Sequence, residues 1–336
     1  MAQAQKPIAV LGGGSWGTAL AVLLAHSGQS TMLWSRDPVQ VANMRRARRN
    51  ERFLPDTEFP ADLQVTHDLA QALQQARDVL VVVPSAAFRT VLANVTHYLR
   101  NGMRIAWGTK GFEPGTGQLL HQVVSSLVGQ RVPAAVISGP TFAREVASGL
   151  PTAVTVAATD QQFATQLAER LHCKRFRVYT STDLIGVQVG GAVKNVLAIA
   201  AGIADGLGFG ANTRAALITR GLAELTRLGV ALGGQPGTFT GLAGLGDLVL
   251  TCTDDQSRNR RFGLALGRGA AVASAQTAIG QVVEGREAAA VVVSLARQFR
   301  VEMPICVEVD RVLRGVCMPR AAVDSLLARD LKPELG

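Results

Sequence analysis

The chain has 336 residues, of which 48% are hydrophobic and 18% charged, and it contains 35 glycines. This composition excludes a disordered or fibrous protein, and the length exceeds the size at which one hydrophobic core usually stops growing. The excess of 34 basic over 25 acidic residues gives a net charge of +9, which suits an anionic small ligand or a nucleic acid. Much of this excess lies in the cluster Arg45, Arg46, Arg48, Arg49 and Arg52. We interpret the cluster as one solvated helix face and expect no nucleic-acid partner, because aromatic residues are not interleaved with these charges.

The four cysteines are far apart and form no C-x-x-C pair. The first residues lead directly into a strand pattern, without the hydrophobic region of a signal peptide. No stretch reaches about 18 uninterrupted apolar residues, so we expect no membrane span. The histidines show no metal-ligand spacing, so we expect no metal. These features together predict a cytoplasmic protein.

The first strand and the loop after it carry the clearest nucleotide-binding signal. An apolar run at residues 7–11 predicts a buried strand, residues 12–17 follow with the pattern G-x-G-x-x-G, and residues 18–26 are helical in pattern. In such a loop the first glycine makes a tight turn and the second lets the backbone approach a pyrophosphate. The third lets the helix pack on the strand, and the start of the helix faces the anion. This order predicts a dinucleotide site.

The end of the second strand bears on the choice of cofactor. A strand is predicted at residues 31–34, and an NAD site usually carries an acid just after it, where the ribose hydroxyls bind. Ser35 takes that place, and Arg36 could hold a 2′-phosphate. Asp37 is the alternative acid, but Pro38 beside it favours a helix cap instead. The cofactor is therefore NADPH or NADH, with NADPH favoured.

Strand and helix patterns alternate through the rest of the first half. Further buried strands are predicted at residues 79–83, 104–107, 134–137, 152–156 and 175–179. The alternation predicts an α/β fold, with a Rossmann-type doubly wound sheet in a dinucleotide-binding domain at residues 1–180. Because ligands bind at the carboxyl ends of such strands, we single out Lys110 and the loop at residues 138–143. Lys110 could instead be an ordinary loop lysine.

From residue 181 to residue 336 we expect an all-helical substrate and catalytic domain. Helices are predicted at residues 184–205, 212–231, 244–252, 257–267, 285–299 and 304–314. The first of these is apolar on every side, which indicates a buried helix, yet Lys194 lies in its middle. Gly190 and Gly191, one turn earlier, permit the close approach of a ligand or another backbone. A structural lysine is one interpretation, and a proton donor or acceptor is the one we favour.

Two further motifs follow in the second half. Asp247 ends a glycine-rich segment that begins at Gly241, and it lies among apolar residues where an unpaired carboxylate would be costly. Ser257, Arg258 and Asn259 open a helix, where backbone N–H groups and an arginine could clamp a phosphate. These arginines could also be plain surface charge. Glu284 lies in the turn before a later helix.

Four motifs closely resemble those of bacterial NAD(P)-dependent sn-glycerol-3-phosphate dehydrogenases. They are G-x-G-S-W-G-T-A from Gly12, G-G-A-V-K-N ending at Asn195, G-L-A-G-L-G-D ending at Asp247, and S-R-N at residues 257–259. The resemblance implies oxidation of sn-glycerol 3-phosphate to dihydroxyacetone phosphate, or the reverse reduction, which supplies phospholipid synthesis. It implies a small-molecule substrate as partner, and a homodimer is one option.

The resemblance also implies roles for individual residues, with Lys194 as the catalytic lysine. The implied substrate contacts are Lys110, Gly139, Thr141, Lys194, Asp247, Ser257, Arg258 and Asn259. The implied cofactor contacts are Ser15, Trp16, Arg36, Lys110, Ala143, Arg258, Val282 and Glu284, in addition to the loop glycines Gly12, Gly14 and Gly17.

The residues themselves suggest a compatible mechanism. Reduction of a ketone needs a hydride from the nicotinamide and a proton for the new alkoxide, which Lys194 can supply if desolvation lowers its pKa towards neutrality. Lys110 and Asn195 could polarise the carbonyl, and Asp247 could orient Lys194. Arg258 and the helix start after it would hold the phosphate.

Two other classes of protein compete with this interpretation. A β-hydroxyacid dehydrogenase would resemble it in fold but carries Lys-x-x-x-Asn, whereas Asn195 here directly follows Lys194. A nucleotide-sensing regulator that binds NAD(H) and DNA would explain the positive charge, but it leaves Lys194 and Asp247 without a role. Since the fold suits all three, the motifs of the second half decide.

Overall fold

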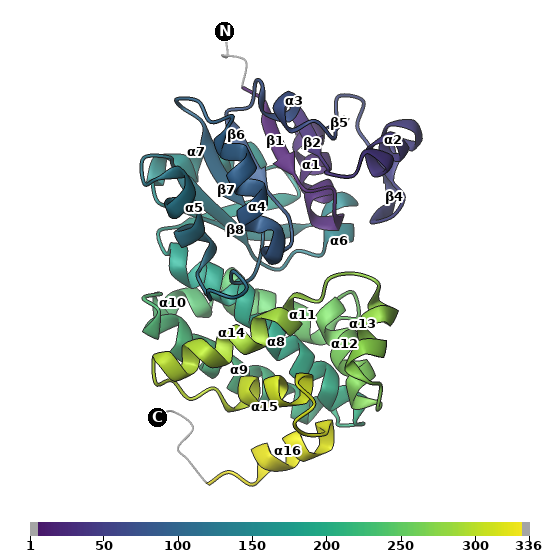
Figure 1. Ribbon diagram of the computed structural model, residues 1–336, viewed down its shortest axis with the longest axis vertical. Helices are drawn as coiled ribbons and strands as arrows, with labels where there is room; N and C mark the ends of the chain where they lie inside the picture. The colour runs from purple at the N-terminus through teal and green to yellow at the C-terminus, as the bar shows by residue number, and fades with distance from the viewer. Residues whose placement is uncertain (1–5, 331–336) are drawn as a thin grey trace.

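The computed structural model describes residues 6–330 and has an α/β part and a helical part, drawn one above the other in Figure 1. Its main sheet has eight strands in the order β10-β9-β8-β7-β6-β1-β2-β5. These strands are β1 (Ile8–Leu11), β2 (Thr31–Trp34), β5 (Gln64–Thr66), β6 (Asp78–Val81), β7 (Arg104–Trp107), β8 (Ala134–Ser138), β9 (Thr152–Ala158) and β10 (Phe176–Ser181). A small antiparallel pair is formed by β3 (Arg49–Asn50) and β4 (Leu54–Glu58).

The predicted Rossmann-type sheet is confirmed. All neighbouring pairs from β5 to β8 are parallel, and the chain reverses its direction of growth between β1 and β6. The loops after β1 and β6 therefore diverge at a topological switch point, where open α/β sheets bind ligands. Two strands depart from the simple pattern: β9 runs antiparallel to β8, and β10, which is parallel to β9, shares its direction.

The sheet is covered by helices on both faces because its side chains alternate between two cores. Ile8 and Val10 pack with α1 and α7, whereas Ala9 and Leu11 pack with α3, α4 and α5. The helices of this part are α1 (Ser15–His26), α2 (Pro38–Ala47), α3 (Leu69–Leu73), α4 (Ser85–Thr96), α5 (Leu120–Val128), α6 (Ala143–Ala147) and α7 (Gln161–Leu171). This two-sided cover holds the carboxyl ends of β5, β2, β1, β6, β7 and β8 at one edge of the sheet.

The helical part is built around α8 (Leu184–Gly206). Every residue of α8 from Gly186 to Ala204 is buried, as its all-round apolar sequence predicts. Its partners are α9 (Ala211–Ala231), α10 (Pro236–Phe239), the π-helix η1 (Leu242–Gly246), α11 (Asp247–Thr253), α12 (Arg258–Gly267), α14 (Glu284–Gln298) and α15 (Pro304–Leu313). The helix α13 (Val272–Ile279) packs on α12, and α16 (Pro319–Leu327) packs on α15 and α12. Although α8 is long and apolar enough to cross a membrane, 89% of its most apolar window is buried inside the protein, as in a core helix.

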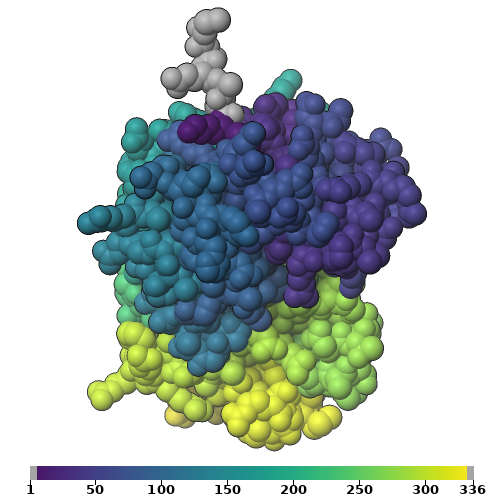
Figure 2. Space-filling view, turned by 45° about the horizontal axis from the view of Figure 1, so that its top comes forward, coloured from purple at the N-terminus to yellow at the C-terminus, as the bar shows by residue number. Residues whose placement is uncertain are grey.

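The two parts meet along a continuous boundary, where the purple and blue N-terminal residues lie against the green and yellow C-terminal ones (Figure 2). The last strand ends at Ser181 and α8 begins at Leu184. Val187 of α8 joins one core of the sheet, whereas Val193 joins the core of the helical part. Because α8 belongs to both cores, the division into domains at residues 1–180 and 181–336 stays a prediction.

The sequence patterns did not predict several elements of the structure. They are β3, β4, β5, the short helices α10, α13 and α16, and the π-helical turn η1. The interpretation of Arg45–Arg52 as one helix face is wrong, because α2 ends at Ala47 and Arg48 adopts a left-handed conformation (φ 50°). The Arg48 guanidinium then donates to the carbonyls of Leu63 (3.1 Å) and Ala61 (3.2 Å). These arginines therefore hold the chain around the β3–β4 pair in place by hydrogen bonds.

Candidate active site

The loop after β1 has the geometry that the three motif glycines predict. Gly12 has φ 136°, and a Cβ there would lie 2.2 Å from the carbonyl oxygen of Val82. A Cβ on Gly17 would lie 2.0 Å from the carbonyl oxygen of Gly12. Both glycines are therefore required by contacts within the protein.

Gly14 differs from its neighbours in this loop. A Cβ there would meet no protein atom within 4 Å, and φ is an ordinary −81°. The helix α1 begins at the next residue, and no side chain caps it. Open space in front of uncapped N–H groups is what a pyrophosphate requires, so the loop fits a dinucleotide.

Residues beyond the motif hold this loop in place. The Gln40 side-chain amide donates to the carbonyl of Gly13 (2.6 Å), and the Ser35 hydroxyl donates to Gln40 (2.9 Å). Asn50 also donates to the Gly13 carbonyl (2.9 Å) and to the hydroxyl of Thr18 (2.8 Å). Ser35 thus supports the loop from the position where NAD-binding proteins often carry an acid.

The two charged residues after Ser35 have different surroundings. Asp37 accepts hydrogen bonds from the backbone N–H groups of Val39 (2.9 Å) and Gln40 (3.3 Å), which confirms that it caps α2. Arg36 is exposed, and its guanidinium makes no hydrogen bond or ion pair with another residue of the described chain. Arg36 is therefore the charged group at this strand end that can turn to a ligand.

The second group of predicted residues converges on Asp247, at the start of α11. Its carboxylate is almost fully buried and accepts hydrogen bonds from the ammonium groups of both Lys194, on α8, and Lys110, after β7 (2.6 Å for Lys110). Lys194 also donates to the hydroxyl of Thr251 (2.9 Å), one turn after Asp247. Lys110 donates in addition to the carbonyl of Gly139, after β8 (3.0 Å). Three segments far apart in sequence thus meet at one carboxylate, and Lys110 links it to a fourth.

Two glycines of α8 make this convergence possible. A Cβ on Gly190 would lie 2.3 Å from the carbonyl oxygen of Ala243 in η1, the turn that leads into Asp247. A Cβ on Gly191 would lie 2.9 Å from the Ser138 hydroxyl and 3.4 Å from Cγ of Lys110. A larger side chain at Gly190 would push η1 away from α8, and one at Gly191 would crowd the Ser138 hydroxyl next to Lys110.

Burial changes the acid–base behaviour of Lys194. Its pKa is lowered to about 7, chiefly because desolvation disfavours the ammonium form. The charge of Asp247 opposes this shift and raises the pKa, whereas the neighbouring charge of Lys110 lowers it further. A group with this pKa is present in both protonation states near neutral pH, which is what proton transfer requires.

Asn195 and Asn259 form a buried hydrogen-bonded chain between three helices. The Asn195 amide donates to the Gly191 carbonyl of its own helix (3.3 Å) and accepts from the Asn259 amide of α12 (2.9 Å). The Asn259 side-chain oxygen in turn accepts from the backbone N–H of Gly285 in α14 (2.9 Å). Both amides are engaged within the protein, and they fix the starts of α12 and α14 relative to α8.

Those two helix starts carry the remaining predicted contacts. The Ser257 hydroxyl caps α12 by accepting from the backbone N–H of Arg260 (3.2 Å). Arg258 is exposed, and its guanidinium donates to Gln281 (3.4 Å). Partial desolvation lowers the pKa of the Arg258 guanidinium, the charge of Glu284 raises it, and the charge of Arg261 lowers it further. Arg258 and Glu284 are thus electrostatic neighbours.

Glu284 connects the helical part to the sheet. Its carboxylate accepts from the hydroxyl (2.7 Å) and the backbone N–H (3.3 Å) of Ser85, which follows β6. Desolvation raises the pKa of Glu284, and the hydrogen bonds from Ser85 lower it. Val282, two residues earlier, is 42% exposed. Glu284 therefore lies at the topological switch point, next to the nucleotide loop in the order of the sheet.

The chain matches two family models that together span most of its length. They are described as NAD-dependent glycerol-3-phosphate dehydrogenase N-terminus, over residues 7–164, and C-terminus, over residues 183–324. The chain belongs to the NAD-dependent glycerol-3-phosphate dehydrogenase family. This confirms the resemblance in the sequence motifs.

Relatives cover nearly the whole chain. A glycerol-3-phosphate dehydrogenase (NAD(P)+) of Nitrosococcus oceani is 61% identical over 325 residues, which are 97% of this chain and 94% of that protein. One from Aeromonas hydrophila is 58% identical over 331 residues, or 98% and 99% of the two chains. The crystal structure of the Coxiella burnetii glycerol-3-phosphate dehydrogenase superposes with a TM-score of 0.94 at 53% identity. The superposition covers 97% of this chain and 99% of that chain. A ketopantoate reductase of Ralstonia eutropha shares the fold alone, with a TM-score of 0.60 at 17% identity.

Other predicted residues of this family member have less specific surroundings. Thr141 donates its hydroxyl to the Gly139 carbonyl (3.2 Å), and Ala143 begins α6. The Trp16 ring nitrogen is buried without a hydrogen-bond partner among the described residues, close to Gly108 at the end of β7. An unpartnered donor beside the nucleotide loop is consistent with a contact to a cofactor.

Sequence reasoning missed three residues of this site. Thr251 lies one helical turn after Asp247, and that spacing was the available signal. Ser85 follows a strand end, but nothing in the sequence indicates that its partner is Glu284, 199 residues away. Asn50 lies in a short strand without a recognisable pattern. Residues 6–330 contain no group of three or more His, Cys, Asp or Glu side chains that could hold a metal.

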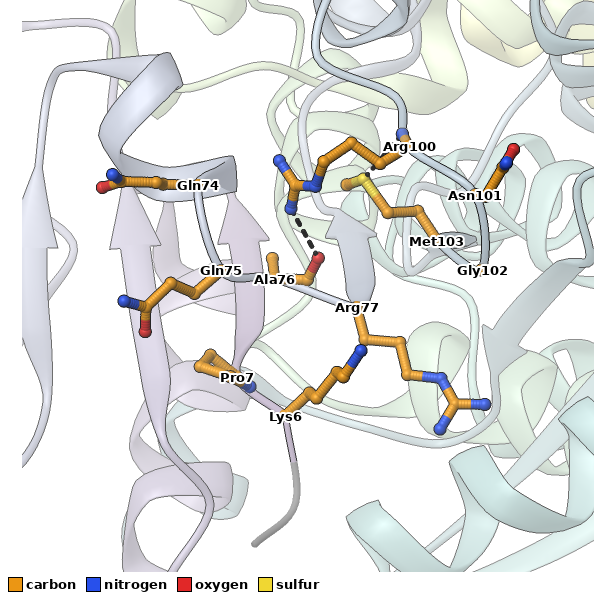
Figure 3. Close-up of a pocket in the computed structure, with 10 residues that line it drawn as sticks. All are labelled: Lys6, Pro7, Gln74, Gln75, Ala76, Arg77, Arg100, Asn101, Gly102 and Met103. Carbon is orange, nitrogen blue, oxygen red and sulfur yellow. Dashed lines mark hydrogen bonds between the residues drawn. The ribbon is translucent and has the colours of Figure 1, made fainter.

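A cavity of about 370 Å³ lies away from this site (Figure 3). Its lining includes Lys6, Arg77 and Arg100, which precede β1, β6 and β7, so it is at the opposite edge of the sheet. Figure 3 shows Arg100 donating to the carbonyl of Ala76 (3.2 Å), and it also donates to that of Leu73 (2.7 Å). Arg100 therefore holds the connection into β6, and none of the predicted site residues lines the cavity.

Proposed function

We propose that this chain interconverts sn-glycerol 3-phosphate and dihydroxyacetone phosphate with NAD(P)(H), and that Lys194 donates and accepts the proton. The observation that carries the proposal is the buried carboxylate of Asp247 between the ammonium groups of Lys194 and Lys110. It supports acid–base chemistry because the pKa of Lys194 is lowered to about 7. The names of relatives at 55–61% identity support the same reaction.

A nicotinamide cofactor held at the loop from Gly12 to Gly17 would supply the hydride for the carbonyl carbon in the proposed reduction. Lys194 gives its proton to the oxygen that becomes the alcohol, and the reverse reaction returns that proton to the lysine. Asp247 and Thr251 orient the Lys194 ammonium, since both hold it by hydrogen bonds. Lys110, the second cation at Asp247, stabilises negative charge as it develops on the oxygen.

We assign Asn195 and Asn259 mainly as positioning residues in this reaction. Both side-chain amides are engaged with each other and with backbone groups. They support the proposal by fixing the start of α12, where Ser257 and Arg258 lie. Gly139 and Thr141, beside Lys110, remain proposed substrate contacts.

The phosphate of the substrate is proposed to bind at Arg258 and the start of α12. Arg258→Ala removes a charge-assisted hydrogen bond of about 1.5–3 kcal/mol, so kcat/KM for dihydroxyacetone phosphate should fall about 10- to 150-fold. Reduction of the phosphate-free compound dihydroxyacetone should fall much less, because Arg258 acts on it only through its proposed contact with the cofactor. Arg268→Ala, which removes an exposed charge from the far end of the same helix, is the matched control and should leave both rates unchanged.

This experiment separates the proposal from its two rivals. A β-hydroxyacid dehydrogenase would show no preference of the parent for the phosphorylated compound. A nucleotide-sensing regulator would not catalyse the oxidation of NADH or NADPH in the presence of either compound. If Arg258→Ala depresses both substrates equally, Arg258 serves the cofactor or the fold and the phosphate site is elsewhere.

For the cofactor, we propose that the nucleotide lies along the loop from Gly12 to Gly17 and that NADPH is preferred. The exposed, unpaired guanidinium of Arg36 supports a site for the 2′-phosphate. Lys110, Ala143, Arg258, Val282 and Glu284 complete the proposed set of cofactor contacts.

The proposal includes a biological setting. The product sn-glycerol 3-phosphate would supply phospholipid synthesis, and the protein would be cytoplasmic. The latter is supported by the four cysteines, all of which are free thiols. A homodimer is also proposed, and analytical ultracentrifugation of the purified protein tests it directly.

A further inference from the structure

One buried hydroxyl next to the lysine cluster has no assigned role. Ser138 is the last residue of β8, and only 2% of it is exposed. Its side-chain oxygen has no hydrogen-bond partner among the described residues. Burying a hydroxyl without a partner destabilises the folded state, and an alanine would fill the same place without that cost.

The position of Ser138 places this hydroxyl at the proposed reaction centre. A Cβ on Gly191 would lie 2.9 Å from the Ser138 oxygen and 3.6 Å from Cδ of Lys110. The next residue, Gly139, accepts a hydrogen bond from the Lys110 ammonium (3.0 Å). Gly191 lies one turn before Lys194 on α8. The hydroxyl is therefore packed between the end of β8 and Gly191 of α8, beside the side chain of Lys110.

We propose that the Ser138 hydroxyl binds the terminal hydroxymethyl group of the three-carbon substrate and thereby selects for it. The inference rests on the proposed function, which gives the other oxygens their partners: the reacting oxygen lies at Lys194 and the phosphate at Arg258. The remaining oxygen of dihydroxyacetone phosphate is a hydroxyl, which both donates and accepts. A serine hydroxyl has the same two capacities and is unoccupied in the free protein.

This assignment predicts that removal of the Ser138 hydroxyl weakens substrate recognition, whereas the stability of the protein is unchanged or increases. A hydroxyl that serves the fold contributes to stability, so its removal lowers Tm. A hydroxyl that is unpartnered until substrate binds does not contribute, so its removal leaves Tm unchanged or raises it. A site that hydrogen-bonds a substrate hydroxyl also discriminates against an analogue lacking that group.

The test compares Ser138→Ala with the parent on two substrates, dihydroxyacetone phosphate and hydroxyacetone phosphate, which carries a methyl in place of the hydroxymethyl group. The parent should prefer dihydroxyacetone phosphate in kcat/KM. Ser138→Ala should reduce this preference about 10- to 100-fold, chiefly by slowing turnover of dihydroxyacetone phosphate. Its Tm should be equal to or above that of the parent, and its affinity for the cofactor should be unchanged.

Thr159→Val is the matched control, because the Thr159 hydroxyl is hydrogen-bonded to backbone groups of Ala134 at the other end of β8. It should lower Tm and leave the substrate preference intact. If Ser138→Ala behaves like this control, the hydroxyl is structural and the inference is wrong. Equal losses with both substrates would also overturn it, since the hydroxyl would then contact the carbonyl oxygen or the phosphate. If the parent reduces neither compound, the proposed function is wrong, and the substrate that the Ser138 inference names is then wrong as well.

Discussion

Lys194 and Asp247 form a buried ion pair at the contact between α8 and α11, and only 8% and 1% of the two side chains are exposed. The pair is not isolated, because Lys110 adds a second positive charge to the same carboxylate. One anion therefore compensates two cations in a desolvated site. Such an arrangement leaves the protonation of one lysine sensitive to small changes in its neighbours.

The two partners of Lys194 should shift its pKa in opposite directions. Asp247→Asn removes the charge that raises this pKa, so the pKa should fall below 7, whereas Lys110→Met removes a like charge and should raise it. Reduction needs protonated Lys194, so its pH profile falls as pH rises through this pKa. The midpoint of that limb should move down by about one unit or more in Asp247→Asn and up in Lys110→Met. Shifts in the same direction would contradict the electrostatic account.

Gly12 and Gly14 should differ sharply when each is replaced by alanine. Gly12→Ala places a Cβ 2.2 Å from a backbone oxygen at φ 136°, so the protein should lose several degrees of Tm or fail to fold. Gly14→Ala meets no protein atom and should fold with an unchanged Tm, yet bind the cofactor at least about tenfold more weakly, because its methyl group enters the pyrophosphate site. Thermal denaturation and fluorescence titration with NADPH measure the two effects. Normal cofactor binding by Gly14→Ala would place the pyrophosphate elsewhere.

Arg36 should decide the choice between the two nicotinamide cofactors. Its guanidinium is exposed and free to pair with a 2′-phosphate, so the parent should have a higher kcat/KM with NADPH than with NADH. Arg36→Asp should reverse this preference, because it adds repulsion of the phosphate and offers an acceptor to the ribose hydroxyls. Steady-state kinetics with both cofactors provide the ratio. An unchanged ratio in the variant would remove Arg36 from the site.

Glu224, outside the site, should give the stability a distinct dependence on pH. Its buried carboxylate accepts from the backbone N–H groups of Ile305 (2.7 Å) and Cys306 (3.2 Å), and burial raises its pKa from 4.5 to about 7. Between these two values the folded state binds a proton that the unfolded state does not. The contribution of Glu224 to the free energy of unfolding therefore grows as pH falls from 7 to 4.5.

Glu224→Gln keeps one acceptor for Ile305 and abolishes this titration. Urea denaturation at several pH values across that window should show a weaker rise in stability towards acid in the variant than in the parent. Parallel curves for the two proteins would show that Glu224 does not titrate there.

The sequence predicted what depends on local pattern. The apolar surroundings of Lys194 indicated a buried helix, and the glycine spacing from Gly12 to Gly17 predicted the nucleotide loop. Each of these signals lies within a single short segment of the sequence. The antiparallel direction of β9 was not predictable, since an apolar run does not encode direction. The pairing of Glu284 with Ser85 and of Asn195 with Asn259 depends on the packing of α14 and α12 onto the rest of the fold. Such partners have no signature in a single sequence.

The most direct test of the account is the pH dependence of kcat/KM for reduction of dihydroxyacetone phosphate by the parent and by Lys194→Ala. The parent should lose activity as pH rises through about 7, where Lys194 loses its proton. Lys194→Ala should reduce kcat by roughly 10²–10⁴-fold, should lack this limb, and should bind the cofactor as the parent does. A variant that keeps most of its kcat, or keeps the limb near pH 7, would show that another group transfers the proton.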